Sequence, residues 1–129
     1  MEKFVPFHQH MIVKCWVLNP PKEVDILNKW LIDLVHAIDM KVVAGPTSIY
    51  VADPGNEGLT GTVTLATSHA SIHIWDNIEL PLIQFDLYSC KAFNPEIVLN
   101  QFNQWNLYSY NWIMLDRNDN IKVIKDVTI

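Results

Sequence analysis

Residues 58–75 constrain the fold most strongly, because the apolar alternation in this segment changes face halfway along. Val63 and Leu65 place apolar side chains at odd positions, whereas Ile72 and Ile74 place them at even positions. Side chains of a β-strand alternate with a period of two, so one uninterrupted strand cannot bury both sets on the same face. We therefore expect a break or a bulge in the middle of this segment. Such irregularities re-aim side chains and cluster near active sites.

The irregularity falls at Thr67 and Ser68, and the segments around it alternate between strand and helix patterns. The pattern predicts the order β-α-β-β-β-α-β, which is typical of a two-layer α+β sandwich with an antiparallel sheet and two helices on one face. We expect Asn19 to cap the first helix and Asn94-Pro95 to open the second. The predicted strands cover 10–18, 40–51 with an interruption at Gly45-Pro46, 58–75, 82–90 and 110–115, the helices 22–39 and 94–105, and a short apolar end 121–124.

Length and charge narrow the class of protein. The chain has 129 residues, half of them hydrophobic, so we expect a single domain over residues 1–129. No apolar run approaches the roughly 20 residues that cross a bilayer, and the first six residues lack the apolar core of a secretion signal, so we expect a cytoplasmic protein without membrane contact. A net charge of −5 without basic clusters argues against nucleic acid and favours a small cationic ligand.

One face of the predicted sheet is left uncovered and carries side chains that could act chemically. If the even apolar positions of 70–74 face the helices, the intervening side chains point to the face that Cys90 shares. Histidine transfers protons near neutral pH, and a thiol can donate one. The residues expected on this face are His69, Ser71, His73, Trp75, Gln84, Asp86, Tyr88 and Cys90.

Structural interpretations of these residues stay open. Free cysteines are among the most buried residue types, so Cys90 could be a core or interface residue, and Cys15 in a doubly apolar strand is expected in the core. His73 could be structural, and Trp75 could contact a second subunit as readily as a ligand. Histidine pairs such as His8 with His10 lack a third ligand at a familiar spacing, so we predict no metal site.

Four motifs together resemble the short prokaryotic S-adenosylmethionine decarboxylases, which are pyruvoyl enzymes of polyamine and spermidine biosynthesis. The motifs are GLTG at 58–61, SHASIHIW at 68–75, DLYSC at 86–90 and NPE at 94–96, and the likeness spans about residues 8 to 117. The resemblance implies a proenzyme that cuts itself before Ser68. The serine hydroxyl would attack the preceding carbonyl, the ester would eliminate, and the new N-terminus would become the pyruvoyl cofactor.

The resemblance also implies roles for other residues. Thr60 matches the hydroxyl residue that assists processing, His73 the histidine that handles the proton in ester elimination, and Cys90 the thiol that protonates the product carbon. It further implies a homodimer whose sites draw on both subunits, with a Schiff base to the substrate amine and with Trp75 against the adenine. A pyruvoyl carbonyl acts as an electron sink, so no external cofactor is expected.

The chain departs from this pattern at two positions. Thr67 precedes the cut where the family usually has glutamate, and Asn77 stands where a glutamate holds the ribose hydroxyls. The turn that follows is about two residues longer, so either Glu79 replaces that glutamate from a shifted backbone or adenosine recognition is lost. Three functions therefore remain open: decarboxylation of S-adenosylmethionine, decarboxylation of arginine or ornithine, and an unprocessed, non-catalytic homologue that binds a ligand or regulates a partner decarboxylase.

Overall fold

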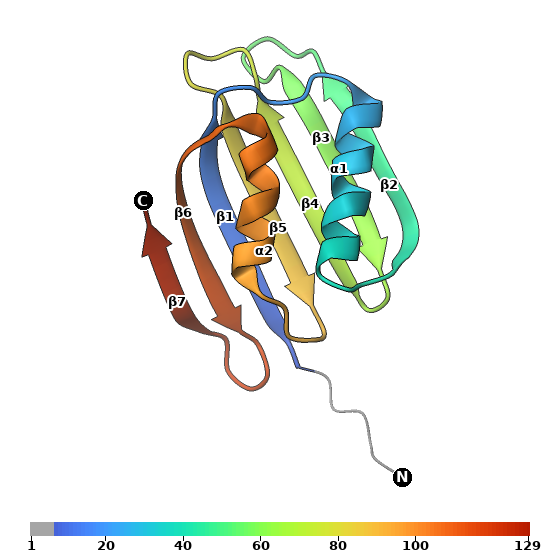
Figure 1. Ribbon diagram of the computed structural model, residues 1–129, viewed down its shortest axis with the longest axis vertical. Coiled ribbons are helices and arrows are strands. Elements are labelled where there is room, and N and C mark those ends of the chain that lie inside the picture. Colours follow the sequence, from blue (N-terminus) through green and yellow to red (C-terminus); the bar gives the residue numbers. More distant parts are fainter. Residues whose placement is uncertain (1–6) are drawn as a thin grey trace.

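The computed structural model describes residues 7–129, and their strands form one antiparallel sheet with two helices packed on it (Figure 1). Residues 1–6, on which the expectation of no secretion signal rests, lie outside the described part. Neither α-helix within 7–129 is long and apolar enough to cross a membrane. The elements are β1 Gln9–Val17, α1 Val24–Ala37, β2 Val42–Val51, β3 Gly58–Leu65, β4 Ser68–Trp75, β5 Leu82–Ser89, α2 Pro95–Gln101, the 3₁₀ turn η1 Phe102–Trp105, β6 Leu107–Asp116 and β7 Lys122–Thr128.

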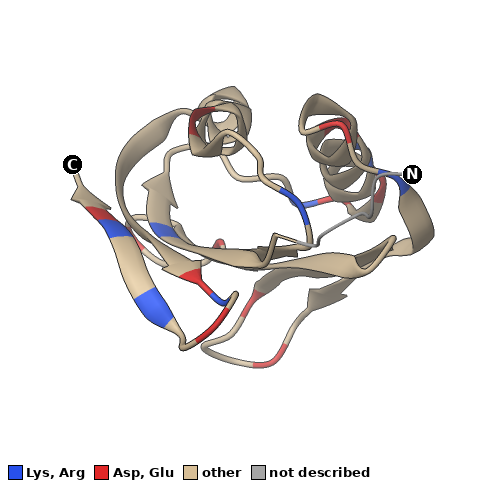
Figure 2. Cartoon of the chain, turned by 90° about the horizontal axis from the view of Figure 1, so that it is seen from below, with Lys and Arg blue, Asp and Glu red and all other residues tan. Residues whose placement is uncertain are grey.

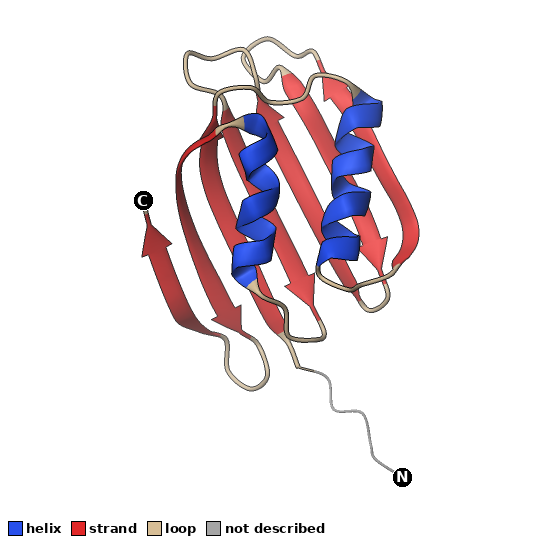
Figure 3. Ribbon diagram, in the orientation of Figure 1, coloured by secondary structure: helices blue, strands red, loops and turns tan. Residues whose placement is uncertain are grey.

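The strands lie in the order β2-β3-β4-β5-β1-β6-β7, and both helices cover the same face (Figures 2 and 3). The predicted α+β sandwich is therefore confirmed. The first strand of the chain is an inner strand, because β1 pairs with β5 on one side and β6 on the other. Its odd side chains, from Met11 to Val17, are fully buried under the helices, and Cys15 lies among them as predicted.

One apolar face of each helix packs on the sheet and forms the core with it. Leu27, Leu31 and Leu34 of α1 are fully buried, and Gly61 of β3 lets this helix approach the sheet closely. A Cβ atom at Gly61 would lie 3.0 Å from a methyl group of Leu27. The expected cap at Asn19 is wrong, because α1 begins only at Val24, after Glu23, whose side chain makes no capping hydrogen bond.

The second helix begins as its sequence predicts. The Asn94 side chain accepts a hydrogen bond from the Glu96 backbone N–H at 3.0 Å, and Pro95 occupies the first turn, where no intrahelical N–H donor is needed. Trp105 then stacks on Trp30 of α1, with ring centroids 4.6 Å apart, while the Trp30 indole N–H donates to the Gln101 carbonyl at 2.8 Å. These aromatic contacts join the two helices over the sheet.

The face change in residues 58–75 is the signature of a hairpin, and the expected bulge is replaced by a two-residue turn. β3 ends at Leu65, β4 begins at Ser68, and these two residues pair across the turn. In this register Val63 lies opposite Ala70, so odd residues of β3 and even residues of β4 share the buried face. The alternation therefore changes parity without any irregularity within a strand.

Two further elements differ from expectation. β2 runs through Gly45-Pro46 without ending, because shifts in the β2–β3 register between Ala44 and Thr47 absorb the irregular residues. β7 extends through Thr128, beyond the predicted short end, since pairing with β6 supports polar residues that carry no strand pattern of their own.

Candidate functional site

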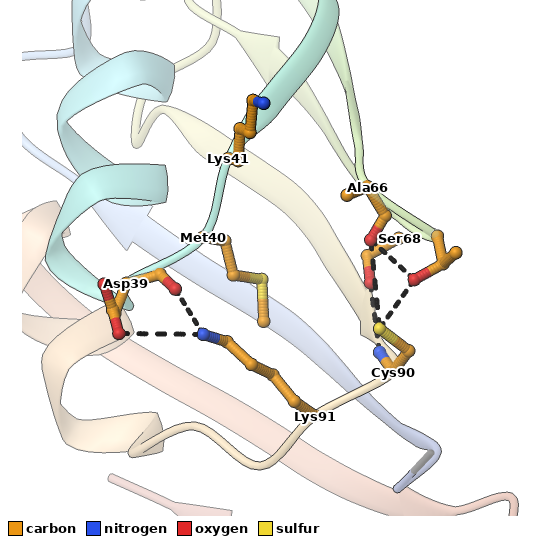
Figure 4. A pocket seen from close by; sticks show the side chains of 8 residues that line it. Asp39, Met40, Lys41, Ala66, Ser68, Cys90 and Lys91 are labelled. Atoms are coloured by element: carbon orange, nitrogen blue, oxygen red, sulfur yellow. Dashed lines mark hydrogen bonds and ion pairs between the residues drawn. The ribbon is translucent and has the colours of Figure 1, made fainter. Parts of the chain in front are cut away.

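The β3–β4 turn brings the predicted residues Ser68 and Cys90 together (Figure 4), and Thr67 contacts Cys90 there. Ser68 is 6% exposed, and its Oγ accepts a hydrogen bond from the Cys90 backbone N–H at 3.0 Å. Cys90 follows the last residue of β5, and the Thr67 hydroxyl donates to its Sγ at 2.7 Å. The predicted cleavage position and the predicted proton donor are thus in direct contact.

Thr67 occupies a strained part of this turn. Its φ is +59°, in the left-handed region that favours glycine or asparagine and is unusual for a β-branched residue. The Thr67 hydroxyl also lies 2.6 Å from the Ala66 carbonyl oxygen, which ties the side chain to the turn that carries it. Strained backbone of this kind recurs at functional sites, where the surrounding structure holds it in place.

A pocket of about 250 Å³ opens beside the turn. Ser68 and Cys90 line one side of it, Asp39 and Lys41 line the other, and the Lys91 side chain extends from beside Cys90 to Asp39 (Figure 4). The Lys91 ammonium group donates to the Asp39 carbonyl oxygen and lies 3.8 Å from the Asp39 carboxylate (Figure 4). A small molecule in this pocket would therefore meet the serine, the thiol and two cationic side chains.

The surroundings of the two cysteines shift their pKa values in opposite directions. The Thr67 hydroxyl, then the Ser68 side chain and the nearby Lys91 charge, lower the pKa of the Cys90 thiol, although partial burial opposes them. Burial raises the pKa of the Cys15 thiol to about 12. The thiolate is the reactive form of cysteine, so Cys90 is the reactive thiol of the two.

Thr60 and His73 form a second cluster, separate from the turn. The Thr60 hydroxyl lies 3.1 Å from the His73 Nδ1 atom, and the two residues pair across β3 and β4. His73 is five positions from Ser68 along β4, roughly 16 Å at the rise of a strand, and its side chain points to the opposite face. The structure therefore joins Thr60 to His73 but keeps both away from Ser68 within one chain.

The uncovered face carries much of the polar row that the sequence predicts, but Cys90 lies beyond the end of β5, where it contacts Thr67 at the turn. His69, Ser71 and His73 lie beside Tyr88, Asp86 and Gln84 of β5. Asp86 accepts hydrogen bonds from the Ser71 hydroxyl and from His10 Nε2, the latter at 2.8 Å. These bonds, the one from His10 above all, lower the pKa of the Asp86 carboxyl against the opposing effect of burial.

A third group lies at the other end of β4, around Trp75. The Trp75 indole N–H donates to Asn56 Oδ1 at 3.1 Å, and the Asn77 amide donates to Glu57 Oε2 at 3.0 Å. The other oxygen of Glu57 accepts the Gly55 backbone N–H at 2.9 Å. Hydrogen bonds from its own backbone N–H and from Asn77 lower the pKa of the Glu57 carboxyl. Glu57 is the acid that sequence reasoning missed, since nothing in its turn-rich loop distinguishes it from other loop acids.

Comparison with known proteins places this geometry in a family. A sequence model described as S-adenosylmethionine decarboxylase matches residues 9–110, which is most of the chain. The chain belongs to the S-adenosylmethionine decarboxylase family. A crystal structure of the adenosylmethionine decarboxylase from Aquifex aeolicus VF5 has the same fold, with a TM-score of 0.69, 19% identity, and coverage of 87% of this chain and 91% of that one. No curated protein matched the sequence.

Membership of the S-adenosylmethionine decarboxylase family implies a decarboxylase, that is, a lyase. In this family member the predicted residues fall into three groups. Ser68, Thr67 and Cys90 meet at the β3–β4 turn, Thr60 and His73 pair five residues farther along the hairpin, and Trp75 and Asn77 lie beyond them at its far end. Glu79 is exposed in the connection from β4 to β5, and Asn77 bonds Glu57. Among residues 7–129, no three His, Cys, Asp or Glu side chains are arranged to hold a metal ion.

Proposed function

We propose that residues 1–129 form a single self-processing domain, a pyruvoyl-dependent S-adenosylmethionine decarboxylase of polyamine biosynthesis that cuts between Thr67 and Ser68. The observation that carries this proposal is the contact of Ser68 with Cys90 at a strained turn beside a pocket. Each feature serves the chemistry: the serine supplies the nucleophile, the turn keeps the peptide out of its relaxed geometry, and the pocket gives a substrate access.

Cleavage begins at the Ser68 hydroxyl. Its oxygen attacks the carbonyl carbon of Thr67, the amide C–N bond breaks, and the nitrogen takes a proton, so the peptide bond becomes an ester. Loss of the Ser68 α-proton then expels the Thr67 carboxylate. Water next replaces the Ser68 nitrogen at the α-carbon, and this nitrogen leaves as ammonia. The Cys90 N–H donated to Ser68 Oγ favours the first step, because it stabilises negative charge on that oxygen.

The Ser68 environment also suits the group that cleavage would form. A pyruvoyl group at this position supplies an electron sink for decarboxylation. Cys90 lines the same pocket, and its sulfur lies near the Ala66–Ser68 segment, so its thiol can deliver a proton to a product carbon there. Cys90 is the proton donor in this proposal.

The separation of His73 from Ser68 favours a site shared by two subunits. A gap of roughly 16 Å along β4 is too long for His73 to act on its own Ser68. His73 is exposed on the uncovered face, where a second copy can approach. We infer a homodimer in which Thr60 and His73 of one chain assist cleavage in the other.

Substrate recognition is assigned to the cluster around Trp75. The indole offers an aromatic surface for adenine, and the Asn77–Glu57 pair offers an amide and a carboxylate for ribose hydroxyls. In this proposal Glu57, rather than Glu79, replaces the family glutamate that holds the ribose hydroxyls. The net charge of −5 favours a cationic substrate such as S-adenosylmethionine, and arginine and ornithine are the alternative substrates.

The second candidate function is an unprocessed homologue that binds a ligand or regulates a partner decarboxylase. Thr67 favours it, because a threonine before the cut brings a branched side chain and no carboxylate to the scissile bond.

Intact mass under denaturing conditions separates the two candidates. Processing yields residues 1–67 and 68–129, with the second fragment lighter by the conversion of serine to pyruvoyl. Ser68→Ala abolishes both fragments, whereas Ser109→Ala on β6, a matched control, retains them. A single full-length species after prolonged incubation of the unmodified chain refutes self-processing. Release of labelled carbon dioxide from S-adenosylmethionine, arginine or ornithine then identifies the substrate.

A further inference from the structure

We infer that the Thr67 hydroxyl is a positioning group for Cys90, which holds the sulfur against the turn and favours its reactive form before the chain is cut. The inference deepens the proposed function, because it assigns a task to the residue that departs most from the family pattern. It concerns the intact chain, so it can be tested whether or not cleavage follows.

Three atoms at the turn carry the inference. The Thr67 hydroxyl lies 2.7 Å from Cys90 Sγ and 2.6 Å from the Ala66 carbonyl oxygen, and the sulfur lies 3.8 Å from that same carbonyl. Hydroxyl, carbonyl and sulfur thus form a closed triangle. Without the hydroxyl, the sulfur would keep only its 3.8 Å contact with the Ala66 carbonyl oxygen in this triangle.

The triangle persists because the Thr67 backbone is held in the left-handed region. At φ +59° the side chain lies close to the preceding carbonyl, which brings the hydroxyl into reach of both partners. The strand register brings Cys90 to Thr67, because the β4–β5 ladder runs through His69 and Tyr88 toward these two residues. The strained backbone of Thr67 therefore places its hydroxyl against the Cys90 sulfur.

The charged groups around the sulfur are few. Lys91 follows Cys90 directly, and Asp39 and Lys41 line the opposite wall of the pocket. Lys91 bonds the Asp39 carbonyl oxygen, so its ammonium group is directed away from the sulfur. The Thr67 hydroxyl is therefore the donor in closest contact with the thiol side chain, and a donor to a sulfur favours the thiolate.

Alkylation of Cys90 by iodoacetamide across a pH series tests the inference. All chains carry Ser68→Ala, so that each stays intact and differs from the parent chain at one further position only. Removing the hydroxyl by Thr67→Val or Thr67→Gly is expected to slow alkylation several-fold near neutral pH and to move the reactive midpoint to more alkaline pH. Thr67→Ser keeps the hydroxyl and is expected to retain the rate and the midpoint.

The glycine variant guards against misfolding, because glycine adopts the left-handed backbone without strain. Thr62→Val, the same change on an exposed position of β3, is the matched control and is expected to leave Cys90 reactivity unchanged. Buried Cys15 reports opening of the fold if it becomes alkylated. Equal rates and midpoints in the valine, glycine and parent chains would overturn the positioning role. Alkylation of Cys90 is measured in uncut chains, so a failure of cleavage or decarboxylation would not affect this test.

Discussion

At the scale of single residues, Thr67 has an unfavourable backbone conformation and a side chain that contacts the reactive cysteine. A β-branched residue in the left-handed region is disfavoured, yet its hydroxyl lies within hydrogen-bond distance of both the Ala66 carbonyl and the Cys90 sulfur. The two effects can be separated, since alanine and glycine both lack the hydroxyl and differ in how easily they adopt a positive φ.

We expect Thr67→Gly to be more stable than Thr67→Ala by about 1 kcal/mol, the typical cost of placing a Cβ atom in the left-handed region. Both variants lose the same hydrogen bonds, so the difference isolates backbone strain. Urea unfolding of the two variants measures it. Equal stabilities would mean that the turn relaxes to a different conformation when the threonine is replaced.

At the scale of elements, Asp86 ties three strands together on the uncovered face. The carboxylate on β5 accepts from His10 on β1 and from Ser71 on β4, so one ionised group bridges neighbours on both sides. Its pKa is lowered chiefly by the His10 bond. A carboxyl whose pKa is lowered on folding stabilises the folded state above its unfolded pKa. That stability is lost as the pH falls through its folded value.

Asp86→Asn is therefore expected to lower stability at neutral pH and to flatten the acid limb of the stability curve below about pH 4, where an unfolded aspartate takes up its proton. Denaturant unfolding at a series of pH values measures both effects. Asp119→Asn, an exposed change in the β6–β7 turn, is the control and should follow the unmodified chain. An acid limb as steep in Asp86→Asn as in the unmodified chain would contradict the bridging role.

Much of this architecture could be predicted from the sequence. The leucine spacing of α1 and the asparagine cap of α2 gave correct helices, because each signal is local. The hairpin was predicted only as an irregular strand, since Ala66-Thr67 lacks the glycine or asparagine that marks such turns. Glu57 was not predicted, because its contact with Asn77 joins loops that meet only after the strands pair.

At the scale of the whole molecule, the proposed site is divided between two places on one chain. Ser68 lies at the turn end of the β3–β4 hairpin, beside Cys90, whereas Thr60 and His73 lie five residues farther along the hairpin, on the face opposite the Ser68 side chain. The proposed homodimer with shared sites would unite them, and it makes a prediction that no single-chain site makes.

Ser68→Ala and His73→Ala chains, each expected to stay uncut alone, should complement one another when co-expressed. In a mixed dimer the His73→Ala chain keeps its serine and receives a histidine from its partner, so we expect that chain to be cleaved. With equal amounts of both chains, random pairing puts about half of the His73→Ala chains in mixed dimers, so up to about half of them should be cut. Denaturing electrophoresis or intact mass measures the fragments. Replacing the first chain by one that carries both changes is the control and should give no cleavage. Absence of fragments from the complementing pair would argue against shared sites.

The position of β1 has a consequence for the product of cleavage. A cut after Thr67 would assign β1, β2, β3 and α1 to one fragment and the remaining elements to the other. Yet β1 lies between β5 and β6, so the strand order interleaves the two fragments. The chain ends created by the cut lie at the ends of two inner strands, β3 and β4, of a continuous hydrogen-bonded sheet. The two fragments would therefore migrate as one particle under native conditions, and strand separation would require unfolding of the whole sheet.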